Sequence, residues 1–440
     1  MPASEHSTLV ADCASGAGPR KLRDLVAVNF GNALEWFDWT IYTIFAPYFA
    51  VQFFPSEDRA AALLATLAIF AVGFVTRPIG GLVFGLYADR VGRKASLTLA
   101  MLVTAGGSIV IALAPTFDSV GILASIILLV ARLAQGMAHG GEMGTSITYL
   151  VERAPRHRRA LYGSTSWVSV VIGTMIATLA GLALTSNLDR AEIEAWGWRI
   201  PFALGGLLGV YGLYLRRKLT ETESFEKGRR AKTRSGIEPL LRNWRGIAVV
   251  FGLSAGGSIM FYTWLIYSPT FAQIGRGLDA RSAFTASLVA QCIFLVAIPL
   301  VGWLADRYGR RLFVALFGVG FILLTLHLDG RIDDSFGGLL SAMTIALVLL
   351  ACLFGVNTAV WSEVFPTGVR ATGVAGPLSL ATAIFGGTAP YVNTYLSQQG
   401  HHGWFLYYLM AVSGITLLTA ILMPETRDLD LDRPDTGRLS

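Results

Sequence analysis

The sequence predicts an all-α polytopic membrane protein, with twelve transmembrane helices arranged as two pseudo-symmetric six-helix halves. The first observation is composition: only 15% of the 440 residues are charged, and the mean hydropathy is +0.56. The second is spacing, because the apolar residues fall into twelve stretches, each near the ~20 residues that span a bilayer. The third is an internal repeat, a polar segment after the second stretch that recurs after the eighth. Together these observations exclude a soluble enzyme built around one core.

The apolar stretches define the expected helices, with boundaries accurate to a few residues. These helices are 25–53, 60–85, 95–115, 120–150, 160–184, 197–216, 246–272, 283–303, 311–328, 338–361, 371–396 and 403–423. A basic segment after the sixth stretch divides the chain into domains. The expected parts are a disordered tail (1–24), an N-terminal six-helix bundle (25–216), a linker (217–245), a C-terminal six-helix bundle (246–423) and a second tail (424–440).

The positive charge of the chain follows membrane topology rather than nucleic-acid binding. The formal net charge is +6, and the Lys and Arg residues gather in alternate connections between the apolar stretches. This bias predicts that those connections, the linker and both termini face the cytoplasm. The first residues are polar and small and do not resemble a cleavable signal peptide. A multi-pass protein of the bacterial cytoplasmic (inner) membrane is therefore expected.

The sequence gives no indication of a cofactor, a metal centre or an enzyme active site. The three cysteines, Cys13, Cys292 and Cys352, have neither the spacing of metal ligands nor that of a disulfide framework. No G-x-x-x-x-G-K-[ST] motif occurs, so no ATP site is expected. No nucleophile–base constellation rises above chance, and catalysis is the least favoured class of function.

The internal repeat consists of two near-identical ten-residue segments. G-L-Y-A-D-R-V-G-R-K occupies 85–94, and G-W-L-A-D-R-Y-G-R-R occupies 302–311. Each lies between the second and third apolar stretches of its half, and we interpret both as turns. Gly92 and Gly309 would supply the freedom that a tight turn needs. Two copies in register make a generic basic loop a poor explanation.

This repeat resembles the signature loop of the major facilitator superfamily. The resemblance implies a transporter that works by alternating access, with signature loops that help to close the cytoplasmic side. It implies that Asp89 and Asp306 each meet the N-terminus of a helix in the other half, and that the basic residues pair with carboxylates. The expected cytoplasmic gate contains Gly85, Asp89, Arg90, Gly92, Arg93, Asp306, Arg307, Arg310, Glu363 and Arg370.

The first expected helix carries two acidic residues within its apolar run. Glu35 and Asp38 are three residues apart and share a helix face, and Tyr42 lies one turn further on. Because a carboxylate inside a membrane is costly, such residues usually belong to an ion or proton pathway. Proton coupling is therefore predicted for the pair, and purely structural pairing with an arginine remains the alternative.

The fourth expected helix carries a stripe of polar residues. Arg132, Gln135, His139 and Glu142 follow the i, i+3, i+7, i+10 spacing of one helix face, and Tyr149 lies near it. Gln135 and Tyr149, together with Tyr42 of the first helix, are candidates for substrate contact. An arginine this deep requires a cavity or a counter-charge, which Asp38 or Glu35 would supply. Arg132 would clamp a substrate carboxylate or compete with substrate for Asp38. His139 and Glu142 join the predicted proton-coupling set, and polar packing is the alternative for His139.

Two more arginines and a set of neutral side chains complete the candidate site. Arg77 is the other intramembrane arginine and would either line the cytoplasmic end of the pathway or act as a snorkelling gate residue. Arg199 lies where the sixth helix begins, as an anion attractor or, preferably, an interfacial anchor. The second half offers neutral or aromatic candidates for substrate contact, namely Tyr262, Tyr267, Asn357 and Asn393. We therefore predict proton coupling and charge recognition in the first half, and shape recognition in the second.

Several further stretches narrow the resemblance to one branch of the superfamily. G-N-A-L-E-W-F-D, R-L-A-Q-G with G-G-E-M-G-T-S-I-T-Y-L, W-G-W-R-I-P-F-A-L-G and E-V-F-P-T-G-V-R-A-T-G resemble the metabolite–proton symporters. That branch includes permeases for α-ketoglutarate, citrate, shikimate and dicarboxylates, and an osmolyte symporter for proline and betaine. The R-L-A-Q-G…G-E-M-G-T-S-I-T-Y run, together with A-I-F-G-G later in the chain, resembles the α-ketoglutarate permeases in particular.

The resemblance implies proton-coupled import of a small organic acid, such as α-ketoglutarate or a related di- or tricarboxylate, by a monomer in the lipid bilayer. Uptake of a zwitterionic osmolyte is the alternative substrate class. The tail after Pro424 is too short for the heptads of an osmosensing coiled coil. Export by proton antiport and a non-transporting receptor are the alternatives from other functional classes.

Overall fold

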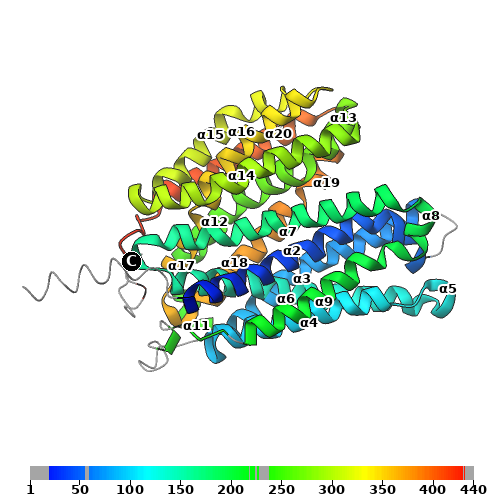
Figure 1. The fold of residues 1–440 in the computed structure, drawn as a ribbon. Helices are drawn as coiled ribbons and strands as arrows, with labels where there is room; N and C mark the ends of the chain where they lie inside the picture. Colours follow the sequence, from blue (N-terminus) through cyan, green and yellow to red (C-terminus); the bar gives the residue numbers. More distant parts are fainter. Residues whose placement is uncertain are drawn as a thin grey trace, which may run out of the picture.

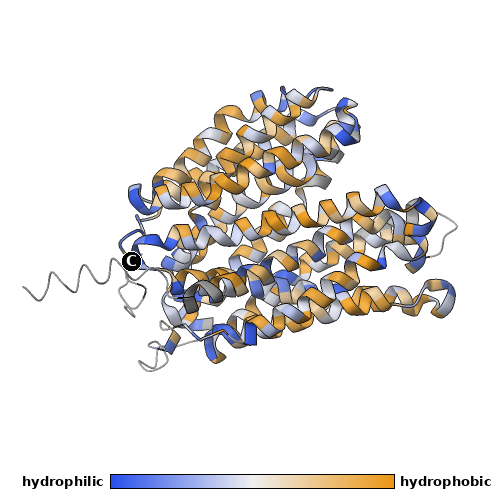
Figure 2. Ribbon diagram, in the orientation of Figure 1, coloured by the Kyte–Doolittle hydropathy of each residue, from blue (hydrophilic) through white to orange (hydrophobic). Residues whose placement is uncertain are grey.

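Long helices running side by side form the whole of the described protein. The structure is a computed structural model, and it describes residues 19–54, 59–217, 219–222, 225–226, 237–429 and 431. Every regular element in these ranges is a helix. The helices run along one direction, with the described part of the chain ending near one end of the bundle (Figure 1). Hydrophobic residues dominate the middle of the helices and hydrophilic residues their ends, as Figure 2 shows.

The first half contains six long helices. They are α2 (Pro19–Phe53), α3 (Arg59–Val91), α4 (Arg93–Leu113), α6 (Ile122–Arg153), α7 (Arg159–Asn187) and α9 (Arg199–Arg217). Short elements fill their connections, namely α5 (Phe117–Val120), η1 (Arg156–Arg158), α8 (Arg190–Glu192) and η2 (Ile193–Gly197). A short helix, α11 (Ile237–Arg242), precedes the second half. Residues 218, 223–224 and 227–236 of the predicted linker 217–245 lie outside the described residues.

The second half repeats the pattern with more interruptions. Its elements are α12 (Trp244–Met260), η3 (Phe261–Tyr267), α13 (Ser268–Arg276), α14 (Ala280–Tyr308), α15 (Arg311–Asp329), α16 (Phe336–Phe354), α17 (Asn357–Glu363), η4 (Thr367–Val369), α18 (Arg370–Ala381), η5 (Thr382–Gly386), α19 (Ala389–Gln398) and α20 (His402–Leu422). Both η3 and η5 are π-helical, a local widening of the helix that is frequent at functional sites. The seventh and eleventh spans are therefore α-helices that contain a π-helical segment.

Nine helical segments of the described chain are long and apolar enough to cross a membrane. The other three long segments are α2, α9 and the α18–η5–α19 run. These three segments are less apolar or less continuous than the other nine. Helix α2 carries charged residues, α9 carries glycines and arginines, and the eleventh span is interrupted. Each of the twelve segments overlaps one predicted stretch, and the all-helical prediction for a multi-pass membrane protein is confirmed.

Two details of the sequence prediction are wrong. The ten-residue repeats are not turns throughout, because α3 continues through Gly85 to Val91 and α14 continues to Tyr308. Only the glycines that follow break the helix, with φ of 127° at Gly92 and 99° at Gly309. In addition, residues 19–24 belong to α2 rather than to a disordered tail. Asp24 is buried there, where it is held by the side chain of Arg153 at 2.8 Å.

The two halves approach each other closely through glycines. Helix α18 of the second half packs against α3 and α6 of the first, and α14 packs against α7. A Cβ atom added at Gly81 would lie 2.8 Å from the carbonyl oxygen of Ala375, and one at Gly144 would overlap the same alanine. Small residues at such crossings let helix backbones pack directly. This contact positions the polar residues of α3 and α6 beside the second half.

Candidate functional site

A buried polar network surrounds Asp38 inside the first half. The carboxylate accepts hydrogen bonds from Nη1 of Arg132 at 2.9 Å and from Nε2 of Gln135 at 3.1 Å. The Ser108 hydroxyl donates to the other oxygen. The Arg132 guanidinium also lies over the ring of Tyr42, 4.1 Å from its centroid. Asp38 and Arg132 are thus paired charges with neutral supporting donors.

Glu35 lies one helical turn from Asp38 and faces His139. Nδ1 of His139 is 2.9 Å from Oε1 of Glu35, and both side chains are 1% exposed. The indole rings of Trp36 and Trp39 lie 5.5 and 5.6 Å from the imidazole. Glu35 is therefore a buried carboxylate whose close ionisable partner is a titratable imidazole rather than a guanidinium.

Arg77 is a buried cation held by aromatic rings. Its guanidinium lies 3.7 Å from the ring centroid of Phe74 and 4.3 Å from that of Trp39. No carboxylate among the described residues lies within 4.0 Å of it. Tyr262 of the second half interacts with it electrostatically, and the Tyr262 ring packs against Phe74 at 5.9 Å. This arrangement leaves Arg77 at the boundary between the halves with capacity to bind an anion.

Arg216 forms an ion pair that the sequence prediction missed. It comes from the last turn of α9, is fully buried, and pairs with Glu142 on α6. A second guanidinium nitrogen donates to the carbonyl of Leu97 at 2.6 Å. The absence of a side chain at Gly31 makes room for it, because a Cβ there would overlap the guanidinium. Glu142 is therefore neutralised by a residue that the sequence assigned to the helix end.

The six charges of this region balance. The carboxylates of Glu35, Asp38 and Glu142 face three guanidiniums, those of Arg77, Arg132 and Arg216. Two acid–base pairs are in direct contact. Glu35 and Arg77 remain, and neither has an oppositely charged Asp, Glu, Lys or Arg partner within 4.0 Å among the described residues. These two residues are therefore the most available for a proton and an anion.

The second half presents a neutral, aromatic face to this region. Phe261 packs edge-on against Trp36 at 5.4 Å. On the same side, Asn357 accepts a hydrogen bond from the indole of Trp167 at 2.9 Å across the two halves. The amide nitrogen of Asn357 is buried and has no hydrogen-bond partner among the described residues. The interior of the second half thus offers dipoles and rings rather than charges.

Four predicted substrate residues are bound elsewhere. Tyr149 donates to the carbonyl of Thr220 at 2.8 Å. Arg199 caps the end of α4 through the carbonyls of Ala112 and Ala114, at 2.7 and 2.8 Å. The two remaining residues have local contacts in the second half: Tyr267 packs on Phe271, and Asn393 accepts from Ser397. None of the contacts just described reaches Glu35, Asp38 or Arg77.

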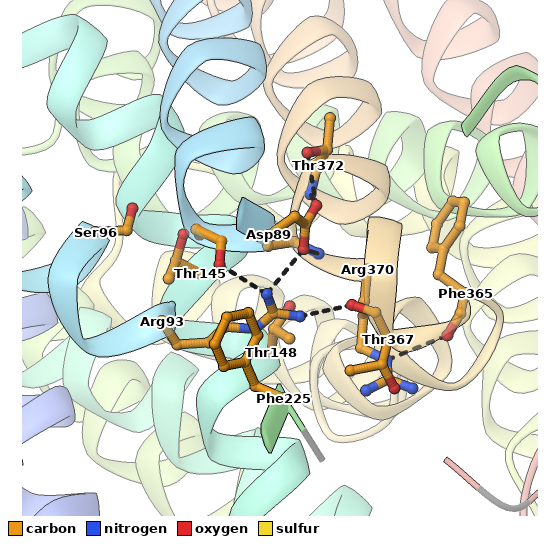
Figure 3. A network of polar contacts seen from close by, with 12 residues as sticks. Asp89, Arg93, Ser96, Thr145, Thr148, Phe225, Phe365, Thr367, Arg370 and Thr372 are labelled. Atoms are coloured by element: carbon orange, nitrogen blue, oxygen red, sulfur yellow. Dashed lines mark hydrogen bonds and ion pairs between the residues drawn. The ribbon is translucent and has the colours of Figure 1, made fainter. Parts of the chain in front are cut away.

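The first repeat forms a polar network between the halves (Figure 3). Asp89 accepts hydrogen bonds from the backbone N–H groups of Ala371 and Thr372, at 3.1 and 2.9 Å, where α18 begins. Arg93 donates to Asp89 at 2.9 Å and to the Thr367 carbonyl at 2.9 Å. A carboxylate at a helix N-terminus is stabilised by the helix dipole and by unsatisfied N–H groups.

The second repeat forms the matching network. Asp306 accepts from the backbone N–H groups of Ala160 and Leu161, at 3.0 and 2.9 Å, where α7 begins. Arg310 donates to Asp306 at 3.0 Å and to Glu363 at 3.3 Å. Both repeats lie at one end of the molecule, which we call the signature end (residues 85–94 and 302–311). The two halves are bonded together there, so this end is closed.

Four residues of this closure were not among the predicted gate residues. Glu152 accepts from Arg370 at 2.7 Å, and Arg159 lies 3.8 Å from Glu363. Glu221 and Glu425 accept from the first N–H groups of α4 and α15. The signal that could have found two of them is a second repeat, E-x-x-P-x-x-x-R, at 152–159 and 363–370.

Two predicted gate residues contribute little to this closure. Arg90 and Arg307 are exposed. The carbonyl oxygen of Arg307 accepts a hydrogen bond from Arg427, and its guanidinium lies 5.5 Å from the Tyr308 ring. Their charges therefore act at the surface of the signature end.

Comparison with known proteins agrees with this architecture. The chain is 36% identical over 426 residues to the α-ketoglutarate permease of Escherichia coli K12, covering 95% of this chain and 98% of the relative. It is 33% identical to a citrate–proton symporter of Salmonella typhi, covering 87% and 90%. It is 31% identical to the proline/betaine transporter of E. coli K12, covering 93% and 85%.

Solved structures show the same fold. The proton:xylose symporter XylE bound to 6-bromo-6-deoxy-D-glucose superposes with a TM-score of 0.79 at 18% identity, covering 94% of this chain and 98% of that one. The family model of the Major Facilitator Superfamily matches residues 28–376. The paired repeats, the helical segments and these matches lead to one conclusion: the chain belongs to the Major Facilitator Superfamily, a family of transporters rather than enzymes.

Proposed function

We propose that the protein imports a small organic anion together with protons across the bacterial inner membrane, by alternating access. The proposal rests on two buried charged residues, Glu35 and Arg77, that do not form a direct ion pair with an Asp, Glu, Lys or Arg of the described residues. Glu35 lacks a guanidinium partner and Arg77 lacks a carboxylate partner within 4.0 Å among the described residues. A proton on the first and a substrate carboxylate on the second would together keep this buried region neutral.

Arg77 is the proposed contact for the substrate carboxylate. Arg77 lies between Phe74 of the first half and Tyr262 of the second, so an anion bound to it would be within reach of both halves. A guanidinium binds a carboxylate in bidentate geometry, which fixes orientation as well as charge. Arg132 was the sequence candidate, but it is already engaged by Asp38. We therefore assign Arg132 to holding the first half together around Asp38.

Glu35 is the proposed proton site, with His139 as its partner. Nδ1 of His139 and Oε1 of Glu35 are 2.9 Å apart but are not aligned as a hydrogen bond in this structure. With a change of side-chain orientation, a protonated Glu35 could donate to the imidazole and an ionised Glu35 could accept from it. Glu142, one turn further along α6, would be the next acidic group toward the signature end. It is paired with Arg216 in this structure.

Coupling follows from electrostatics in this scheme. An anion at Arg77 with Glu35 ionised would leave excess negative charge in a buried site, whereas an anion with Glu35 protonated would not. Only the fully loaded and the empty forms would then reorient readily. The closed signature end, held by Asp89 and Asp306, corresponds to a state open or occluded toward the opposite side.

The topology of the proposal rests on the distribution of basic residues. We place the signature end and both termini in the cytoplasm, with bundles at 25–216 and 246–423 acting as the two moving units of a monomer. The α-ketoglutarate permease and the citrate–proton symporter among the relatives support a di- or tricarboxylate as substrate.

The test is uptake of labelled α-ketoglutarate into proteoliposomes with an inward proton gradient. We expect gradient-dependent uptake that citrate or succinate inhibits by competition, and that Arg77→Gln weakens by raising the KM. Arg242→Gln changes an exposed arginine of α11 and serves as the matched control. Uptake that ignores the gradient, or efflux driven by it, would replace symport with another mode, including antiport export.

A second candidate substrate class is a zwitterionic osmolyte. The observation that favours it is the ring cluster around the same charges, since Trp39 and Phe74 flank Arg77, and Trp36 packs on Phe261. Aromatic faces bind quaternary ammonium groups, and one relative is a proline/betaine transporter. Betaine uptake without competition by dicarboxylates would select this class.

A further inference from the structure

The segment after α20 crosses the boundary between the two halves at the signature end. Residues 424–429 and 431 of this segment are described, and we call them the strap. The strap follows the last helix of the second half, yet two arginines of the first half bind its backbone. Arg156 donates to the carbonyl of Asp428 at 2.7 Å, and Arg159 donates to that of Leu429 at 2.6 Å.

The far part of the strap is fixed to the second half. The Leu431 carbonyl accepts from Nη2 of Arg370 at 3.0 Å and from the hydroxyl of Thr367 at 3.2 Å. Leu431 itself is only 6% exposed. Nearer to α20, Arg427 donates to the carbonyl of Arg307 at 2.7 Å. The strap is therefore anchored on the second half on both sides of the point where the first half grips it.

The strap shares its arginines with the gate. Arg370 binds both Leu431 and Glu152, and Arg159 binds Leu429 while lying 3.8 Å from Glu363. When the halves separate at this end, Arg156 and Arg159 move with the first half and the strap stays with the second. The two bonds from these arginines must then break together with the Asp89 and Asp306 contacts.

We propose that the strap is a built-in brake that holds the signature end closed and slows its opening. Its contacts are charge-assisted hydrogen bonds from guanidiniums to backbone carbonyls, so they depend on the path of the chain more than on the side chains of the strap. The proposal is independent of which substrate is carried.

Two truncations test the brake with a matched control. Ending the chain after Thr426 removes the crossing residues but keeps Glu425, which caps α15. Ending it after Leu431 removes only residues 432–440 and keeps the strap. The reporter is Thr148→Cys, in a background where Cys13, Cys292 and Cys352 are replaced by alanine. Thr148 is fully buried beside Arg93 in the closed network (Figure 3).

The measurement is the rate of maleimide labelling of purified protein in nanodiscs, where both faces are accessible. Loss of the strap is expected to raise the labelling rate about threefold or more over the full chain, by shifting the population toward the open state. The control truncation should label at the rate of the full chain. Equal rates for the two truncations, at any value, would overturn the proposal.

A point variant keeps the test intact if the shorter truncation fails to fold. Arg156→Ala combined with Leu431→Asp removes one crossing bond and expels the buried side chain, and it leaves the gate carboxylates in place. Arg158→Ala, in an exposed position of η1, is the matched control for the loss of a loop arginine. Faster labelling of the combined variant supports the brake, and labelling at the rate of Arg158→Ala contradicts it.

Discussion

Nδ1 of His139 lies 2.9 Å from Oε1 of Glu35, and both residues are buried between α2 and α6. The other two carboxylates of this region, Asp38 and Glu142, contact guanidiniums instead. Glu35 is thus the acid whose charge state is least fixed by its neighbours. That difference motivates the first of the following predictions.

Glu35→Gln should abolish proton-driven accumulation and spare exchange of substrate across the membrane. The amide has nearly the shape of the protonated acid but cannot release a proton, so the loaded form persists. Counterflow and gradient-driven uptake in proteoliposomes measure the two activities separately. Glu238→Gln, on the exposed side of α11, is the control. Accumulation at the wild-type level would remove Glu35 from the proton path.

Arg77→Gln should raise the KM for a carboxylate substrate about tenfold to a hundredfold. A hydrogen bond to a charged group contributes ~1.5–3 kcal/mol, which corresponds to that range of affinity. Arg77→Lys should recover part of the loss, because the charge remains but the planar fork does not. Initial uptake rates over a range of concentrations give the values. An unchanged KM in both variants would place the anion elsewhere.

Asp89→Asn and Asp306→Asn should weaken the closed signature end to a similar degree. Each removes a charge from a helix N-terminus of the opposite half, at a cost of about 1–3 kcal/mol to the closed state. Distances between spin labels placed on the two halves at this end would report the opening. A large effect for one aspartate and none for the other would show that the two networks are not equivalent.

Arg216→Ala should destabilise the protein strongly, by about 3–5 kcal/mol, because it leaves Glu142 buried without its cation. Removing both charges, as Arg216→Met with Glu142→Leu, should restore much of the loss. Thermal unfolding in detergent measures the two variants against the native chain. If the double variant were no more stable than the single one, the pair would not be the source of the loss.

Gly80→Ala should also be destabilising, because a Cβ there would overlap the backbone of Met137 where α3 meets α6. Gly106→Ala is the matched control, since a Cβ at that helical position meets no atom within 4 Å. Alanine also favours helix over glycine, so the control should be neutral or slightly stabilising. Equal melting temperatures for the two variants would contradict a tight crossing.

The helices were predictable because each stretch must be apolar to cross the membrane and polar to leave it. The same rule explains the error at Gly85–Val91 and Gly302–Tyr308. Charged residues can continue a helix past the lipid boundary, so polarity marks the end of the span and not the end of the helix. Only Gly92 and Gly309, with positive φ, end the regular backbone.

The site was predictable as a set of charged residues, but not as a set of pairs. Spacing along α6 correctly placed Arg132 and Gln135 on the face that meets Asp38. Spacing along one helix could not predict that Arg216 lies beside Gly31 and pairs with Glu142, because that contact depends on how three helices pack. The choice between Arg77 and Arg132 as the residue that binds an anion also required the three-dimensional packing of the helices.

The balance of three carboxylates and three guanidiniums has an electrical consequence. A charged core that moved relative to the membrane field would do work of about 2.3 kcal/mol per unit charge at 100 mV. In the empty carrier of this scheme, with Glu35 ionised and His139 neutral, the three carboxylates and three guanidiniums carry no net charge. The return of the empty carrier should therefore be almost indifferent to membrane voltage. Any voltage dependence of transport would then report the charge of the cargo and its protons.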